Sequence, residues 1–116
     1  MNPVVIMVLV NLQRIEYKLP ALRQDAYLTQ LAEARCKSMV EWSHKGWPDK
    51  AIVAKYRNGG ENLAMNFAKP DDAVAGWMAS PTHRANVMDK GYQAVGTAVC
   101  DNAVGKNVIV QLYGEY

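Results

Sequence analysis

The chain has few of the residues that define specialised classes of protein. Its 116 residues include two cysteines and two histidines, and the cysteines lack the close spacing of a zinc or redox motif. The 13 basic and 11 acidic residues are scattered along the chain. Without a Lys/Arg run to form a phosphate-binding stripe, we expect no nucleic-acid partner. Internal repeats, low-complexity tracts and linkers are also missing.

Long apolar segments are absent as well. The one run that could mislead, Pro3 to Val10, is far shorter than the roughly 20 residues that cross a bilayer, and it lacks the basic flank of a signal peptide. We therefore expect no transmembrane segment here, and we expect this run to begin the first helix. Half of the residues are apolar and 21% are charged, which is typical of a single globular domain over residues 1–116.

Helical periodicity dominates the first part of the chain. Apolar residues recur at helical spacing from Val5 to Ile15, and Lys18-Leu19-Pro20 should end that helix. Asp25 is the expected N-cap of a second helix, which Gly46 and Pro48 should stop. The core-facing stripe of this helix consists of Leu28, Leu31, Ala32, Arg35, Cys36 and Met39.

Shorter helices and then strands are predicted in the rest of the chain. One helix should run from about Pro48 to Arg57, another should follow Pro70, and a third should start at Pro81 with Ser80 as its cap. From Ala94 the apolar period changes to two, which predicts a β-hairpin. Helices first and strands last indicate an α+β domain in which helices cover an antiparallel sheet.

Seven groups of residues occur in an order that resembles the CAP superfamily, which comprises cysteine-rich secretory proteins, antigen 5 and plant pathogenesis-related proteins. These groups are Asn11-x-x-Arg14, Leu19-Pro20-Ala21-Leu22, Ser43-His44-x-Gly46, Gly60-Glu61-Asn62-Leu63-Ala64, Ala73-Val74-x-x-Trp77-Met78-x-Ser80-Pro81-x-His83-Arg84-x-Asn86, Val95-Gly96 and Val110-Gln111-Leu112-Tyr113-Gly114. The chain is most similar in pattern to the compact bacterial SCP-like branch.

The resemblance implies a three-layer α-β-α sandwich, with a small antiparallel sheet flanked by helices and a further strand near Gly60 to Ala64. It also implies an extracellular or cell-envelope location. Because no leader precedes Met1, we expect either a mature portion or another export route, such as host lysis by a phage.

The resemblance further implies a polar cavity. Family members better known from eukaryotes line it with two histidines and two glutamates, which correspond here to His44, Glu61 and His83, whereas Ser80 stands where the second glutamate would fall. Zinc or a similar divalent ion could bind to His44 and His83. With one carboxylate fewer, we expect such binding to be weak and no cofactor to be required. Alternatively, both histidines are hydrogen-bonded structural residues, and Glu61 holds backbone amides in a glycine-rich turn.

Other motif residues have simpler interpretations. Asn62 and Ser80 are further candidates for the cavity, and Trp47, in a Gly-Trp-Pro loop, is a candidate for its rim. Ser80 lacks the Gly-x-Ser-x-Gly context of a nucleophile, so capping explains it more simply. Structural roles are expected for Asn11, Arg14, Trp42 and Trp77, and Arg14 should tie the first helix to a neighbouring carboxylate or carbonyl.

Two questions stay open at this stage. Cys36 and Cys100 form either a disulfide or two buried thiols, and the position of Cys36 within a predicted helix favours thiols. The function is either an exported binding or effector module for a small ligand, lipid or peptide, or a metal-assisted hydrolase of peptide or cell-wall material with Glu61 as base. A structural or interaction protein of an envelope or virion is a third possibility. The missing second carboxylate favours binding over catalysis.

Overall fold

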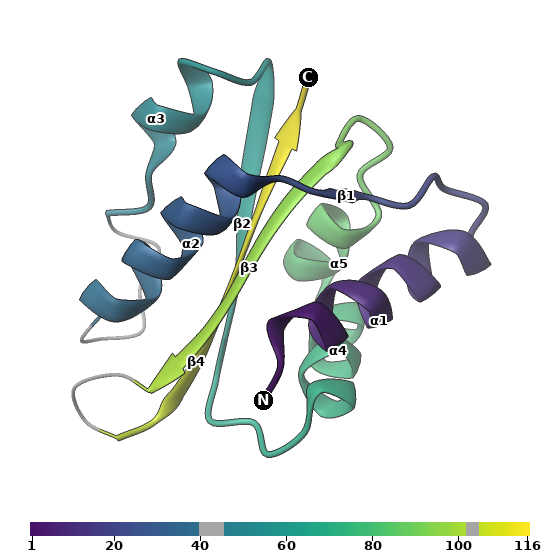
Figure 1. Ribbon diagram of the computed structural model, residues 1–116. Coiled ribbons are helices and arrows are strands. Elements are labelled where there is room, and N and C mark those ends of the chain that lie inside the picture. The colour runs from purple at the N-terminus through teal and green to yellow at the C-terminus, as the bar shows by residue number, and fades with distance from the viewer. Residues whose placement is uncertain (40–45, 102–104) are drawn as a thin grey trace.

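The computed structural model describes residues 1–39, 46–101 and 105–116, and Figure 1 shows their arrangement. Five helices and four strands form among them. In chain order they are α1 (Pro3–Glu16), β1 (Arg23–Gln24), α2 (Ala26–Ser38), α3 (Asp49–Val53), β2 (Asn58–Met65), α4 (Pro70–Ala79), α5 (Pro81–Val87), β3 (Ala94–Asp101) and β4 (Asn107–Glu115).

The sheet has the strand order β1-β3-β4-β2. Strands β3 and β4 form the predicted antiparallel hairpin, and β2 pairs antiparallel with the other edge of β4. The short strand β1 pairs parallel with β3 at only two positions, so it is too short to give a periodic signal in the sequence. Strand β2 therefore forms one edge of the sheet.

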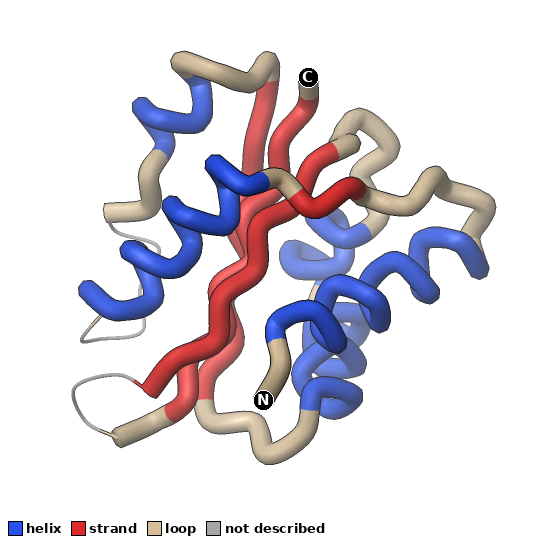
Figure 2. The backbone as a smooth tube through the Cα atoms, viewed as in Figure 1, coloured by secondary structure: helices blue, strands red, loops and turns tan. Residues whose placement is uncertain are grey.

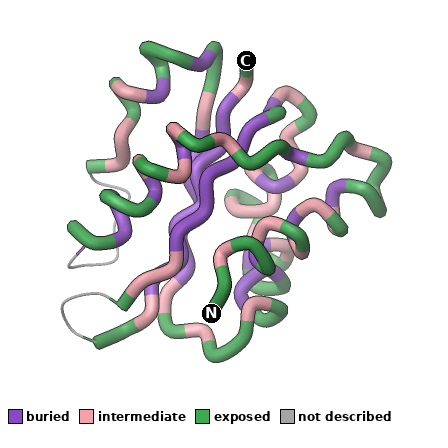
Figure 3. The backbone as a smooth tube through the Cα atoms, viewed as in Figure 1, coloured by how far each residue is buried: buried purple, intermediate pink, exposed green. Residues whose placement is uncertain are grey.

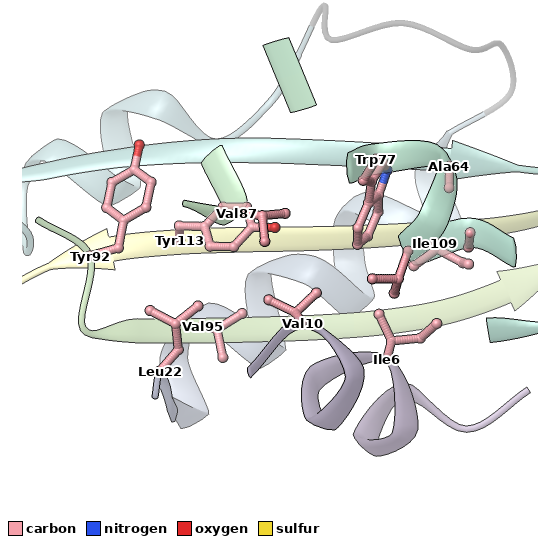
Figure 4. Packing of buried hydrophobic residues seen from close by; sticks show 12 residues of the cluster. Ile6, Val10, Leu22, Ala64, Trp77, Val87, Tyr92, Val95, Ile109 and Tyr113 are labelled. Atoms are coloured by element: carbon pink, nitrogen blue, oxygen red, sulfur yellow. The ribbon is translucent and has the colours of Figure 1, made fainter. Parts of the chain in front are cut away.

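Helices cover both faces of this sheet, which confirms the predicted three-layer sandwich. Helices α2 and α3 lie on one side, and α1, α4 and α5 lie on the other (Figures 1 and 2). Buried positions concentrate along the central strands between the two helical layers (Figure 3). One core packs Ile6, Val10, Trp77 and Tyr113 beneath α1, α4 and α5 (Figure 4), and a second packs beneath α2 and α3.

Two helix boundaries differ from the prediction. Helix α2 ends at Ser38, well before Gly46, because the buried Met39 adopts an extended backbone and turns into the core. Helix α3 covers only Asp49–Val53. The predicted helix does not reach Arg57, because the N–H of Arg57 already donates to the carbonyl of Glu115 at 2.7 Å and begins the β2–β4 pairing.

The predicted N-cap of α2 is confirmed. Oδ1 of Asp25 accepts hydrogen bonds from the N–H of Leu28 at 2.9 Å and the hydroxyl of Tyr56 at 2.7 Å, and Oδ2 accepts from Tyr116 at 3.0 Å. Burial acts to raise the pKa of Asp25, but these donors outweigh it and hold the pKa below its ordinary value. The same carboxylate thus caps a helix and anchors the C-terminal residue.

Arg14 has the predicted structural role. Its guanidinium is fully buried, and burial lowers its pKa. The group donates to four backbone carbonyls at 2.8–3.3 Å, those of Pro20, Val87, Asp89 and Tyr92. Asn11 exchanges two hydrogen bonds with the backbone of Leu22. Both side chains fasten α1 to the segments around it.

Cys36 and Cys100 form a disulfide, with their Cα atoms 6.2 Å apart. Cys36 lies in the last turn of α2 and not in its middle, so its side chain can reach the end of β3. The expectation of two thiols is wrong for this reason. Separately, no helix in the described part of the chain has both the length and the apolar character needed to cross a membrane.

Candidate functional site

The candidate site centres on a buried ion pair between Glu61 of β2 and Arg35 of α2. Nε of Arg35 lies 3.0 Å from Oε2 of Glu61, and Nη2 lies 3.2 Å from Oε1. Only 8% and 2% of the arginine and glutamate side chains are exposed. This two-point contact is among the strong kinds of charge-assisted hydrogen bond, and it fixes the orientation of both groups.

Each member of the pair lines a hollow. Glu61 joins Trp47, Gly59 and Gly60 around a hollow of about 280 Å³. A second hollow of about 300 Å³ is lined by Leu31, Ala34, Arg35, Ser38, Gly46 and Pro48. The half-buried Trp47 therefore lines the same hollow as Glu61, and its role at the rim of a cavity shared with both histidines stays a prediction. The ion pair contributes to the walls of both.

Gly59 and Gly60 lie inside strand β2, so the strand predicted near Gly60 to Ala64 is confirmed and takes the place of the alternative glycine-rich turn. A Cβ at Gly59 would lie 2.4 Å from Cγ2 of Ile52, and one at Gly60 would lie 2.6 Å from the hydroxyl of Tyr92. Both approaches are too close for a side chain. The two glycines therefore allow neighbouring side chains to pack against the strand that carries Glu61.

Asn62 points to the opposite face of the sheet from Glu61, since successive residues of a strand alternate. It is fully buried, and its Nδ2 donates to the carbonyl of His83 at 2.9 Å and to the hydroxyl of Tyr113 at 3.2 Å. Nδ2 of Asn86 donates to Oδ1 of Asn62 at 2.9 Å and to the carbonyl of Glu61 at 3.1 Å. Asn62 and Asn86 thus attach α5 to β2, and a contact of Asn62 with a ligand stays a prediction.

His83 is half-buried in the first turn of α5. Its Nδ1 lies 2.8 Å from Oγ of Ser80, and the tautomer of the ring decides which atom donates. Ser80 occupies the N-cap position of α5, but its side chain makes no capping hydrogen bond. The predicted N-cap position of Ser80 is therefore confirmed, but its hydroxyl contacts the imidazole of His83 and does not cap the helix.

His44 and Trp42 lie outside the described residues. A common cavity for His44, Glu61 and His83 therefore stays a prediction. The structure does bring the backbones of Glu61 and His83 close to each other. Hydrogen bonds of Asn62 and Asn86 connect them where α5 packs against β2.

The described donors are a poor fit to a divalent metal ion. No three His, Cys, Asp or Glu side chains in residues 1–39, 46–101 and 105–116 are grouped so that they could hold one. Both oxygens of Glu61 accept hydrogen bonds from a cation, and Ser80 supplies no second carboxylate. A metal at Glu61 would therefore have to approach the positive charge of Arg35 with little negative charge to offset it.

A buried row of polar side chains crosses the sheet behind the site, and none of the sequence motifs predicted it. Thr97, Gln111 and Asn62 are register neighbours on β3, β4 and β2. Gln111 donates from Nε2 to the hydroxyl of Thr97 at 3.0 Å, and its Oε1 accepts from Tyr113. Burial raises the pKa of Tyr113, so its hydroxyl stays protonated as a donor. The sequence does contain a signal for this row, because polar residues occur at strand positions that face the core.

Comparisons with known proteins agree with this architecture. The model of the cysteine-rich secretory protein family, CAP, matches residues 8–113. The uncharacterised protein YkwD of Bacillus subtilis is 27% identical over 104 residues, a match that covers 81% of this chain and 40% of that protein. This chain therefore spans well under half of the length of that relative.

Solved structures share the fold. An extracellular protein with an SCP domain from Bacillus anthracis superposes with a TM-score of 0.84 at 24% identity, covering 96% of this chain and 39% of that one. An outer surface protein of Borrelia burgdorferi gives a TM-score of 0.79 at 15% identity, covering 96% of this chain and 90% of that one. At these identities the likeness concerns the fold.

Proposed function

This chain belongs to the CAP family, the cysteine-rich secretory protein family, and we propose that it is an extracellular binding module. Its ligand would be a small polar molecule or a short peptide, held in the hollow that Trp47, Gly59, Gly60 and Glu61 line. The observation that carries this proposal is the carboxylate of Glu61 in the wall of that hollow, which its buried ion pair with Arg35 holds in place. A fixed charge pair can orient polar groups without taking part in a reaction.

The hollow has features that small-ligand sites share. Its volume of about 280 Å³ is close to the lower end of the roughly 300–1,000 Å³ usual for such sites. Trp47 offers a rigid aromatic surface beside the polar wall, a combination of apolar and polar groups suited to a peptide or a sugar-linked peptide. Since Arg35 and the disulfide residue Cys36 are adjacent in the last turns of α2, the wall is held to the end of β3.

Hydrolysis has less support. A general base must accept a proton from water, but the oxygens of Glu61 already accept hydrogen bonds from Arg35. Deprotonating water at this carboxylate would compete with the ion pair. Ser80 also provides no second acid or base at the position where eukaryotic relatives are expected to carry one.

An extracellular location agrees with two observations. Disulfides such as Cys36–Cys100 persist in oxidising compartments and are rare in the cytosol of most organisms. The similar structures include one described as an extracellular protein and one described as an outer surface protein. We therefore propose that this chain also acts outside the cytoplasm.

The binding proposal can be tested with muramyl dipeptide as the probe, because it combines a sugar with a short peptide. In heteronuclear NMR titrations, amide shifts should concentrate at Gly59, Gly60 and Glu61 and should disappear in Trp47→Ala. The matched control, Lys69→Ala, replaces an exposed residue and should titrate like the unmodified protein. Absence of shifts up to about 5 mM probe, or shifts that persist in Trp47→Ala, would contradict the proposal for this ligand class.

Product analysis in the same samples separates binding from catalysis. A binding module should leave the probe intact over the full titration. Cleavage of the probe that is abolished by Glu61→Gln would instead favour the hydrolase alternative.

A further inference from the structure

Helix α1 exposes an apolar surface that the described residues of this chain leave uncovered. Seven of the nine large apolar side chains that are exposed among the described residues belong to residues 1–17. Within α1 they are Val4, Val5, Val8, Leu12 and Ile15, between 39% and 57% exposed. The opposite face of α1 buries Ile6, Val10 and Arg14 in the domain. A helix that packs on one side and is still apolar on the other indicates a second contact.

Four of these residues form a seam that is typical of helix pairing. Val5, Val8, Leu12 and Ile15 follow one another at alternating spacings of three and four residues, the pattern that keeps an apolar seam facing a partner helix in paired helices. No charged residue occurs before Arg14. Burying the stretch from Val5 to Leu12 against a similar surface would therefore remove no charged side chain of this stretch from water.

From this pattern we infer that α1 is the contact between two copies of this chain, arranged antiparallel about a two-fold axis. The seam is symmetric about the level of residue 10, since Val5 and Ile15 lie five residues to either side and Val8 and Leu12 lie two. An antiparallel pair thus places Val8 against Leu12 of the partner subunit, and Val5 against Ile15 of the partner subunit. Such a contact uses the same patch on both copies, as a two-fold interface requires.

The charges around the seam favour a second copy over a membrane surface. Asp71 lines the same hollow as the seam residue Leu12, and Glu33 lines the same hollow as Val4, which is next to Val5 on α1. The residues beside the seam thus include two acidic ones. Helices that lie on membranes usually carry Lys and Arg beside their apolar face, where they meet anionic lipid. The acidic side chains beside the seam would instead repel a surface of anionic lipid.

The size of the seam predicts a weak dimer. A half-exposed aliphatic side chain offers roughly 50 Å², so the four seam residues of each copy together bury on the order of 400 Å² of apolar surface. Neighbouring polar side chains add a rim, but the total stays below the roughly 1,200 Å² of standard stable interfaces. We therefore expect monomer and dimer to exchange in a concentration-dependent equilibrium.

Sedimentation velocity over a dilution series from about 5 to 500 μM tests the dimer, because association follows mass action. The mass should rise toward twice that of the monomer, and Val8→Lys should lower the association constant at least tenfold. Val53→Lys is the control, since Val53 is exposed but lies on α3. Circular dichroism melts of both variants should match the unmodified protein, because both positions are exposed. A monomer at every concentration, or an unchanged dimer in Val8→Lys, would overturn the inference.

Cysteine cross-linking tests the orientation, since the native cysteines are joined to each other. A mixture of Val8→Cys and Leu12→Cys chains should form an intermolecular disulfide more readily than either variant alone. Preferential cross-linking of Val8→Cys with itself would indicate parallel helices and overturn the antiparallel arrangement. A third experiment tests for lipid. If the protein forms no dimer but sediments with phosphatidylcholine vesicles, and Val8→Lys abolishes this sedimentation, then lipid covers the seam and the inference is wrong.

Discussion

Removing one member of the Arg35–Glu61 pair should destabilise the domain far more than breaking a surface ion pair would. With 8% and 2% of the two side chains exposed, the remaining charge would stay buried without its partner. Such losses cost about 3–5 kcal/mol, a large share of the roughly 5–15 kcal/mol by which domains are stable. We expect this range for Arg35→Met and for Glu61→Leu. The double variant should lose less than either single variant, because it removes both charges together.

Urea unfolding at pH 7, followed by tryptophan fluorescence, supplies the free energies for this double-mutant cycle. Lys37→Met is the matched control, because Lys37 is an exposed residue on the same helix. It should change stability by less than about 0.5 kcal/mol. Single variants that lose under about 1 kcal/mol, as exposed pairs do, would refute the reasoning. So would a double variant whose loss equals the sum of the two single losses.

Three further predictions concern other parts of the fold. Replacing Cys36 and Cys100 by alanine should lower the free energy of unfolding by about 4 kcal/mol on the chain-entropy estimate, given a separation of 64 residues; a loss under about 1 kcal/mol in urea would contradict it. Arg14→Met should cost about 3 kcal/mol or more, because it leaves buried carbonyls without a donor, and an unchanged melting temperature would refute this. The lowered pKa of Asp25 stabilises the fold above the unfolded value of 3.8, and this contribution is lost as pH falls through the folded pKa. Below that pH, the free energy of unfolding measured in urea should therefore fall less steeply for Asp25→Asn than for the unmodified protein. Equal slopes in the two proteins would contradict this role of Asp25.

Local rules predicted those parts of the fold whose signals lie within a few residues. Asp25 caps α2 as expected because an aspartate three residues before an N–H can accept its hydrogen bond. Pro81 begins α5 because proline fits the first helical position. The ends of α2 and α3 could not be predicted in this way. Tertiary contacts determine them, through the burial of Met39 and the pairing of Arg57 with β4.

The candidate site was predictable only in part. Glu61, Asn62 and His83 were identified by family resemblance, but their roles depend on strand geometry that the motif does not contain. Adjacent positions on β2 send Glu61 toward α2 and Asn62 toward α5. The motif therefore supplies two separate functions, an ion pair on one face of the sheet and a helix anchor on the other.

Arg35 was the missing residue, although the sequence contained a signal for it. It shares the core-facing stripe of α2 with Leu28 and Ala32, and a charge inside such a stripe needs a buried partner of opposite sign. Choosing Glu61 as that partner also required the register of β2. A shift of one residue would turn the carboxylate toward α5 and the amide of Asn62 toward α2, so that neither buried group would meet its partner. The chemistry of the site therefore depends on which face of the sheet residue 61 occupies, and this follows from the pairing of β2 with β4.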